Sequence, residues 1–207
     1  PSPVHARAEE SRASTPPAYH LVIDLEATCD ERTRIPREET EIIEIGAVLV
    51  EGDTLRPVEE FQTFVRPVIH TRLTPFCVKL TSIVQADVDS APEIAAAISA
   101  LRTFIAGRDV LFGSWGDYDR AQLAREAIRH GLALPLGEHH FNMKQAFNER
   151  VGGHKRRGVG QALSYVGLCF DGTAHRGIDD ARNIARLLPY ALGRAELPAR
   201  PQRHKAP

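Results

Sequence analysis

Two acids at the end of an apolar segment are the first residues in this 207-residue chain that could do chemistry. Asp24 and Glu26 follow the run YHLVI, which has the short, β-branched character of a buried strand. Side chains alternate along a strand, so these two carboxylates point to the same face. Buried carboxylates need water, a partner or a metal ion. The alternative is a strand that ends in a polar loop, and the pair alone does not separate the two interpretations.

A second pair of acids, Asp117 and Asp119, lies in GSWGDYDRAQL, directly after a predicted strand and at the start of a predicted helix. Asp is favoured at helix starts because its side chain accepts hydrogen bonds from free backbone N–H groups. Both acids are followed four positions later by a small or apolar residue, so helical spacing does not choose between them. Helix capping is the alternative interpretation for both.

The third candidate group lies in HRGIDDARNIARLL, where His175 precedes Asp180 by five residues. Gly177 is expected just before the helix, with Asp179 and Asp180 in the first turn, where the helix dipole favours acids. A spacing of five puts two residues on different sides of a continuous helix. A histidine in a loop beside an aspartate on the helix brings them together. The alternative is a surface histidine without a role.

Strands and helices alternate in the second half of the chain, after several early strands. Strands are predicted over residues 19–25, 41–50, 60–65, 110–113 and 139–142, and the second and third of them form a hairpin. Helices are predicted over residues 91–106, 117–130, 143–150, 160–166 and 178–192. This pattern indicates an α/β layer architecture.

The two ends of the chain differ in composition from its middle. Residues 1–18 and 194–207 are rich in Pro, Ala and charge without apolar periodicity, and are predicted to be disordered tails. Residues 19–193 are predicted to form one domain. Three widely spaced cysteines make no disulfide framework and fit a reducing compartment, so we expect a cytoplasmic protein. No apolar run approaches the length of a membrane span, and no membrane association is expected.

The charge is nearly balanced, with 26 Lys and Arg against 27 Asp and Glu. This argues against nucleic-acid binding through bulk positive charge, for which a pI above about 9 is typical. It leaves room for a small site in which divalent cations attract the phosphate, because the charge of the ions must be counted there. Carboxylate ligands, with no Cys or second His near them, favour Mg²⁺ or Mn²⁺ over zinc.

Taken together, the pattern D-x-E…D…H-x-x-x-x-D resembles the DEDDh family of 3′→5′ exonucleases, which have an RNase H-like fold. The resemblance spans about residues 19–190 and is greatest to the branch of 3′-end RNA exonucleases that trim histone mRNA and small interfering RNA. It is carried by these segments: YHLVIDLEATCDE, EIIEIGAVLV, FQTFVRP, LTPFCVKLTSIVQADVDSAP, SWGDYD and HRGIDDARNIARL. The fold that it implies is a mixed central β-sheet flanked by helices.

The resemblance implies a role for each acid and for the histidine. Two divalent cations, Mg²⁺ or Mn²⁺, are expected to be held by four carboxylates, those of Asp24, Glu26, Asp119 and Asp180. Glu26 is also expected to take part in catalysis, beside His175 as the general base. Tyr118 favours Asp119 over Asp117, because the branch usually carries an aromatic residue directly before this acid.

Four residues are expected to contact the terminal nucleotide: Thr28, Phe76, Leu80 and Thr81. An aromatic residue such as Phe76 can stack on a base. The alternative is that Phe76 and Leu80, four residues apart, form the buried face of a short helix. Ser82 stands where the branch usually has Gly, and Trp115 is expected to be a core residue. The basic run Lys155–Arg157 is either a solvated surface or a phosphate contact.

The resemblance implies a metal-dependent 3′→5′ exonuclease that releases 5′-mononucleotides from single-stranded 3′ ends, with RNA favoured over DNA. Two alternatives remain open at this point: a DNA-directed proofreading or processing exonuclease, and a non-catalytic binding domain of the same fold. No obligate protein partner is evident from the sequence.

Overall fold

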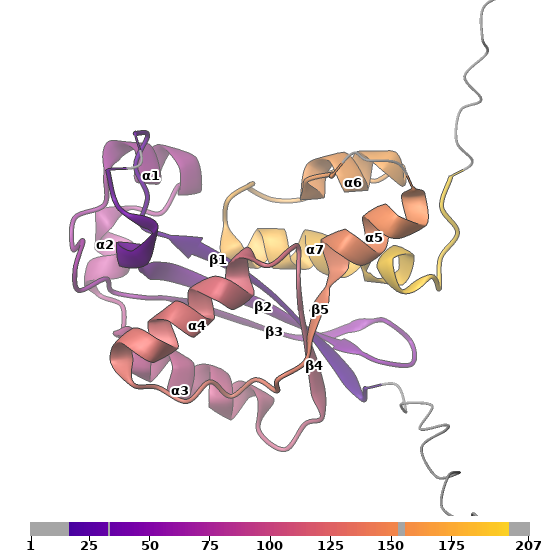
Figure 1. Ribbon diagram of the computed structural model, residues 1–207, viewed down its shortest axis with the longest axis horizontal. Helices are drawn as coiled ribbons and strands as arrows, with labels where there is room; N and C mark the ends of the chain where they lie inside the picture. The colour runs from indigo at the N-terminus through magenta and orange to yellow at the C-terminus, as the bar shows by residue number, and fades with distance from the viewer. Residues whose placement is uncertain (1–16, 33, 153–155, 199–207) are drawn as a thin grey trace, which may run out of the picture.

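A five-stranded mixed sheet forms the centre of the protein, shown in Figure 1 by a computed structural model that describes residues 17–32, 34–152 and 156–198. The strands are β1 (Tyr19–Ala27), β2 (Ile42–Glu51), β3 (Pro57–Phe64), β4 (Val110–Ser114) and β5 (His140–Asn142). Their order across the sheet is β3-β2-β1-β4-β5. β1, β2 and β3 pair antiparallel, whereas β4 is parallel to β1 and to β5. The predicted hairpin and α/β fold class are confirmed.

Helices cover both faces of this sheet (Figure 1). One face carries α3 (Ile94–Ile105) and α4 (Tyr118–His130), and the other carries α5 (Met143–Val151), α6 (Val159–Tyr165) and α7 (Gly177–Leu192). Three short helices lie in the connections: η1 (Arg37–Glu39), α1 (Pro75–Thr81) and α2 (Gln85–Asp89). Of the helices in the described ranges, none has the length and apolar character needed to cross a bilayer.

Alternation along β1 divides its side chains between two cores. Leu21, Ile23 and Leu25 pack in the core that contains α3, whereas Val22 packs in the core that contains α7. Asp24 and Glu26 continue the alternation of Val22, so they lie on the α7 face of the sheet. The prediction that these two acids share a face is confirmed.

The start of α7 lies directly against β2 at two glycines. A Cβ atom added to Gly46 would meet the carbonyl carbon of Gly177 at 2.1 Å, so the backbones touch. A Cβ atom added to Gly177 would lie 3.1 Å from the backbone oxygen of Asp24. Glycine at both positions therefore allows the first turn of α7 to approach β1 and β2 closely.

The predicted N-terminal tail lies outside the described residues, apart from residues 17 and 18. In the predicted C-terminal tail, residues 194–198 are described, and Arg194 and Leu197 contact the domain. Arg194 Nη1 donates to the carbonyl oxygens of Gly52 and Asp53, at 2.8 and 2.9 Å, and Leu197 packs against the α7 core.

Candidate active site

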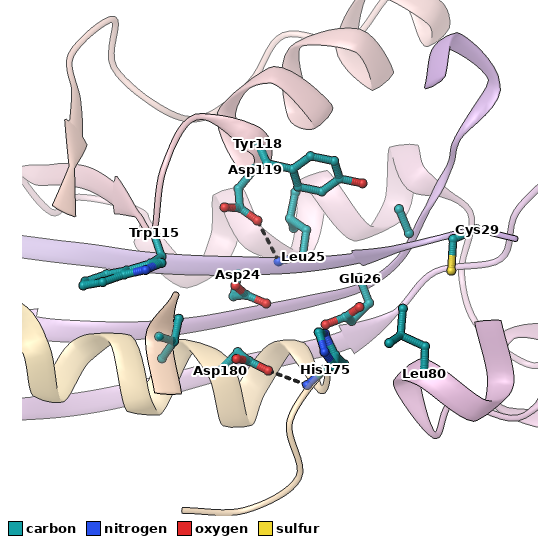
Figure 2. Close-up of a pocket in the computed structure, with 12 residues that line it drawn as sticks. Asp24, Leu25, Glu26, Cys29, Leu80, Trp115, Tyr118, Asp119, His175 and Asp180 are labelled. Carbon is teal, nitrogen blue, oxygen red and sulfur yellow. Dashed lines mark hydrogen bonds between the residues drawn. The ribbon is translucent and has the colours of Figure 1, made fainter. Parts of the chain in front are cut away.

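A pocket of about 350 Å³ opens beside the carboxyl end of β1, between the start of α4 and the start of α7. We call it the acid pocket, and Figure 2 shows the residues that line it. Its lining residues are Asp24, Leu25, Glu26, Ala27, Cys29, Leu80, Trp115, Tyr118, Asp119, Val159, His175 and Asp180. All four predicted metal-ligating acids and the predicted general base therefore face one space.

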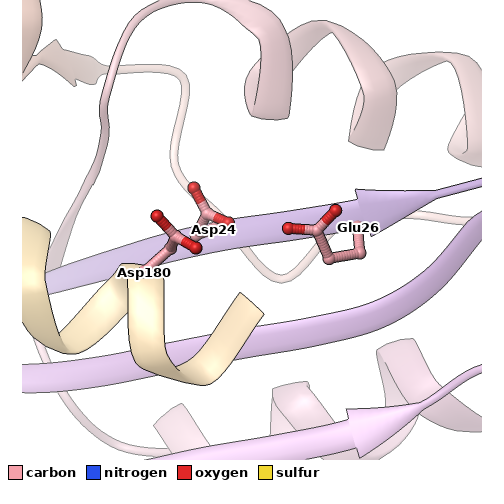
Figure 3. A group of neighbouring side chains, drawn as sticks. All are labelled: Asp24, Glu26 and Asp180. Atoms are coloured by element: carbon pink, nitrogen blue, oxygen red, sulfur yellow. The ribbon is translucent and has the colours of Figure 1, made fainter. Parts of the chain in front are cut away.

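Three carboxylates converge at the centre of the acid pocket (Figure 3). One oxygen from each of Asp24, Glu26 and Asp180 lies within 4.8 Å of the other two. Asp24 and Glu26 come from one strand, whereas Asp180 comes from the first turn of α7, more than 150 residues later. The close approach of α7 to β2 brings these distant parts of the chain together.

Asp119 reaches the pocket from the opposite side of β1. The pairing of β1 with β4 ends at Val22 and Gly113, so β1 continues beyond its parallel neighbour. The backbone N–H of Leu25 donates instead to Oδ1 of Asp119, at 3.1 Å (Figure 2). Asp119 is 4% exposed and lies in the first turn of α4. The gap between two diverging strands thus places this carboxylate beside Asp24.

The structure separates the two acids that the sequence left as alternatives. Asp119 lines the acid pocket, whereas Asp117, directly before α4, does not. The Asp117 side chain is 76% exposed and its Oδ1 lies 3.9 Å from Nδ1 of His140. It also makes no side-chain capping hydrogen bond. Asp119 is therefore the acid of this pair that the fold assigns to the pocket.

His175 lies in the loop before α7 and joins Asp180 through its backbone. The N–H of His175 donates to Oδ2 of Asp180 at 2.7 Å. His175 has φ of 62°, a left-handed conformation that is uncommon for a residue with a side chain. This turn directs the exposed imidazole to the mouth of the pocket while Asp180 stays on the helix (Figure 2). The predicted arrangement of a loop histidine and a helix aspartate is what the structure has.

Burial and mutual repulsion disfavour negative charge in the acid pocket. Burial is the main cause that raises the pKa of Glu26 to about 8, and the nearby Asp180 and Glu44 raise it further. The pKa of Asp24 is also raised well above its usual range, first by burial and then by Asp119 and Asp180. Burial raises the pKa of Asp119 to about 6, although the N–H of Leu25 opposes the shift. Bound cations would reverse these shifts.

The donor set fits hard divalent cations. Carboxylate oxygens are the ligands that Mg²⁺ and Mn²⁺ prefer, whereas zinc sites use Cys and His. In the described ranges, the acid, Cys and His side chains close enough to hold an ion together are the three carboxylates of Asp24, Glu26 and Asp180. Asp119, on the far side of Asp24, is positioned to complete the set.

Two of the four predicted substrate residues are buried away from the acid pocket. Thr28 is 2% exposed, and its hydroxyl accepts a hydrogen bond from the N–H of Glu41 at 2.9 Å. Thr81 is 0% exposed; its hydroxyl donates to the Cys77 carbonyl and accepts from the N–H of Ile83. The hydroxyls of both residues are used in hydrogen bonds within the local fold. The Thr81 side chain is also fully buried, so it has no exposed surface that could contact a nucleotide.

The other two, Phe76 and Leu80, share the outer face of α1. The buried face of this helix consists of Cys77 and Thr81, so the alternative that Phe76 and Leu80 form it is wrong. Leu80 lines the acid pocket, and Phe76 is 36% exposed outside it. Ser82 ends the helix with φ of 60°, a left-handed cap at which glycine is favoured.

Besides Trp115, five residues line the pocket that the sequence did not assign to it: Leu25, Ala27, Cys29, Tyr118 and Val159. Trp115 both lines the pocket and packs in the core as predicted, with its ring centroid 5.6 Å from that of Phe147. Tyr118 was available as a signal, since it directly precedes Asp119. Val159 starts a helix 40 residues further along the chain, and no local pattern connects it to the acids.

The predicted basic segment Lys155–Arg157 is described in part, because Lys155 lies outside the described residues. The guanidinium of Arg157 donates to Oδ1 of Asn148 at 3.1 Å and lies 4.7 Å from the ring centroid of Tyr165. Its carbonyl accepts a hydrogen bond from Nε1 of Trp115. Arg157 thus supports the Trp115 wall of the acid pocket.

Comparison with known proteins identifies the family to which the chain belongs. The family described as Exonuclease matches residues 21–188. ERI1 exoribonuclease 3 from Mus musculus is 33% identical over 181 residues, which cover 82% of this chain and 52% of that protein. The 3′-5′ exonuclease Snipper from Drosophila melanogaster is 33% identical over 210 residues, covering 89% of this chain and 75% of that protein. The chain spans about half the length of the mammalian ERI1 exoribonuclease 3 proteins that it matches.

The fold agrees with this comparison. The crystallographic structure of the nuclease domain of 3′hExo, a DEDDh family member bound to rAMP, superposes with a TM-score of 0.80 at 29% sequence identity. The match covers 88% of this chain and 96% of that domain. The family match includes all four acids and the histidine of the acid pocket. The chain therefore belongs to the exonuclease family, in its DEDDh group, and has the RNase H-like fold that its motifs predicted.

Proposed function

We propose that this chain is a metal-dependent 3′→5′ exonuclease that removes 5′-mononucleotides from single-stranded 3′ ends, with RNA favoured over DNA. The observation that carries the proposal is the convergence of Asp24, Glu26 and Asp180, with Asp119 and His175, in one open pocket. A retired active site has no reason to keep buried acids together, because their repulsion raises the cost of ionising each of them.

The carboxylates of the acid pocket are suited to hold two cations, for which Mg²⁺ is the first choice and Mn²⁺ the second. Such a pair of ions would supply charge stabilisation to the attacking and leaving oxygens of a phosphodiester. Asp24 and Asp180 face each other across the contact between β1 and α7, and Asp119 faces Asp24 from α4. Glu26 lies beside His175 (Figure 2).

His175 is placed to accept a proton from the attacking water. It is exposed at the mouth of the pocket, and its backbone is fixed by the hydrogen bond to Asp180. Histidine serves as a general base near neutral pH in many enzymes. Because the loop, not the helix, carries the imidazole, the ring is free to lie over the reacting phosphate without displacing the Asp180 carboxylate.

The relatives support RNA as the substrate. Curated relatives from Mus musculus and Homo sapiens are named exoribonucleases, and one solved relative, 27% identical, is described in 3′-end-specific recognition of a histone mRNA stem-loop. Leu80 and the phenol of Tyr118 form opposite parts of the pocket wall, and such apolar and aromatic surfaces stack on bases without selecting among them.

All three cysteines are free, which supports a reducing location such as the cytoplasm.

The test is degradation of 5′-labelled RNA and DNA of identical sequence by the purified chain, with Mg²⁺ and with chelator. We expect a ladder that shortens from the 3′ end of the RNA, stops when the chelator is added, and is slower on DNA. A substrate with a blocked 3′ end is the control for polarity. RNA that is bound but stays intact with Mg²⁺ and with Mn²⁺ would overturn the proposal in favour of a binding domain.

A further inference from the structure

A buried glutamate on β2, Glu44, lies next to the acid pocket and takes no part in lining it. It is 0% exposed, and the residues from Ile42 to Val50 around it in the strand are Gly or apolar. Its Cα partner on β1 is Glu26, so the two acids are neighbours across the sheet. Burying a carboxylate costs free energy unless donors satisfy it. The donors that reach Glu44 therefore show which parts of the fold it connects.

All the donors that reach Glu44 within the described ranges come from two places. Oε2 accepts from the backbone N–H of Gly177 at 3.0 Å and from Nε of Arg176 at 3.1 Å. Oε1 accepts from Nε2 of Gln62 on β3 at 2.6 Å. Arg176 directly follows His175, and Gly177 is the first residue of α7. Glu44 thus joins β2 and β3 to the short segment that connects the histidine with Asp180.

The position of this segment determines the geometry of the acid pocket. Asp180 lies one turn into α7 and converges with Asp24 and Glu26, while His175 holds a left-handed backbone conformation immediately before Arg176. A shift of α7 along β2 would move both side chains relative to the acids on β1. The contact of Gly46 with Gly177 limits the approach of the helix, and Glu44 limits its movement away.

Glu44 also controls where the charge of Arg176 lies. The guanidinium is paired with Glu44 and lies 5.2 Å from the ring centroid of Phe64, on the side of β2 and β3. Without that carboxylate, the same cation could turn to the carboxylates of Glu26 or Asp180 and compete there with divalent ions. An Arg held by two contacts is kept out of the acid pocket.

We propose that Glu44 is a positioning residue, which fixes the start of α7 through Gly177 and Arg176 so that His175 and Asp180 face Asp24 and Glu26. The inference rests on the proposed exonuclease function, and it names the residue that determines the shape of that site. Groups that orient metal ligands commonly change metal affinity or activity about 10- to 100-fold when they are replaced.

The test compares Glu44→Gln with Glu41→Gln, a matched change of a second buried glutamate. Glu41 is 3% exposed, and its carboxylate accepts from three backbone N–H groups, those of Val68, Ile69 and His70, outside the acid pocket. We expect Glu44→Gln to lower kcat on RNA about 10- to 100-fold with KM little changed, and to weaken Mn²⁺ binding about 10-fold by calorimetry. Glu41→Gln should lower the thermal midpoint but keep wild-type kcat and Mn²⁺ affinity.

Wild-type kcat and Mn²⁺ affinity in folded Glu44→Gln would overturn the inference. If that variant does not fold, Arg176→Lys replaces it, because the Arg176 side chain is 24% exposed and a lysine keeps the charge while losing the Nε–H contact. Its kcat should fall in the same direction, and an unchanged kcat counts against the proposal. An inactive wild-type chain would contradict the exonuclease function instead, and the Mn²⁺ measurement would still decide the role of Glu44.

Discussion

Two pockets within the described residues both contain buried acids, and one of them has the character of an active site. The acid pocket places Asp24, Glu26 and Asp180 against one another. A second pocket, of about 140 Å³, includes Glu41 and Glu126 among its walls, and both are almost fully buried. Composition alone does not distinguish them, since each contains acids that are rare in protein interiors.

The difference lies in what faces the carboxylates. Glu41 accepts hydrogen bonds from a run of backbone N–H groups, and Glu126 accepts from the N–H of Ile42 at 3.0 Å and pairs with Arg129 and His130. In the acid pocket, carboxylates face other carboxylates. A buried acid that the protein itself neutralises supports the fold, whereas acids that repel one another leave charge for a ligand to neutralise.

The largest expected effect comes from exchanging one acid in each pocket for its amide. Asp24→Asn should lower exonuclease activity at least about 100-fold, because it removes a ligand of the cations that stabilise charge on the reacting phosphate. It should also raise the thermal midpoint of the metal-free protein, since repulsion is removed. Glu126→Gln should do the opposite: activity stays, while stability falls by about 1–3 kcal/mol as the ion pair with Arg129 is lost. Equal losses of activity in Asp24→Asn and Glu126→Gln would contradict the conclusion that the acid pocket, and not the pocket of Glu126, is the active site.

The second prediction separates cation binding from proton transfer within the acid pocket. His175→Asn should lower kcat about 10²- to 10⁴-fold, the range for loss of a general base. Asparagine tolerates the left-handed backbone at this position, so the hydrogen bond to Asp180 should persist. Calorimetric titration should therefore show Mn²⁺ binding close to that of the wild type. Loss of Mn²⁺ binding would place the histidine among the residues that hold the ions.

The third prediction concerns pH and follows from the pKa of Glu26, which burial raises to about 8 from an ordinary value of 4.5. Between these two values the folded chain keeps a proton that the unfolded chain has released. Raising the pH therefore favours unfolding, and the stability of the metal-free protein should fall from about pH 4.5 to about pH 8. Thermal midpoints in chelator and in Mg²⁺ test this, because bound ions should flatten the decline. Glu26→Gln should flatten it as well, and a midpoint that rises with pH in chelator would contradict the prediction.

The smallest expected effect is at the acid that lies just outside the pocket. Asp117→Asn should change kcat less than about twofold, since the exposed carboxylate makes only a long contact to His140. Asp119→Asn, two residues away, should behave like Asp24→Asn. The difference in kcat between these two variants tests whether Asp117 lies outside the functional site while Asp119 lies within it. A large loss in Asp117→Asn would mean that the pocket extends further than the structure places it.

Local patterns in the sequence were sufficient to predict most of the fold and the identity of the acids. The alternation Val22, Asp24, Glu26 is a property of any strand, and it placed two carboxylates on one face without tertiary information. The loop position of His175 followed in the same way, because a spacing of five does not fit one side of a helix. The predicted tails, the cytoplasmic location and the roles of the site residues in catalysis stay predictions.

What the sequence could not predict depends on contacts between distant segments. Asp119 was distinguishable from Asp117 only by resemblance. The contact that decides between them is the hydrogen bond from the N–H of Leu25 to Asp119, which forms because β4 no longer pairs with β1 at that point. Thr28 and Thr81 resembled substrate residues, yet their hydroxyls hold neighbouring backbone groups. The link from Glu44 to the catalytic segment gave no signal in the sequence, because Arg176 and Gly177 lie more than 130 residues further along the chain.

The contact between Gly46 and Gly177 has a consequence for how this site tolerates change. The spacing between the carboxylates on β1 and the carboxylate on α7 is set by the absence of two methyl groups rather than by the acids themselves. Gly46→Ala would press a Cβ atom into the backbone of Gly177, and the helix would have to retreat. The two glycines allow the backbones to touch, so the addition of one methyl group at either position, without any change to an acid, would alter the geometry of the whole ion site.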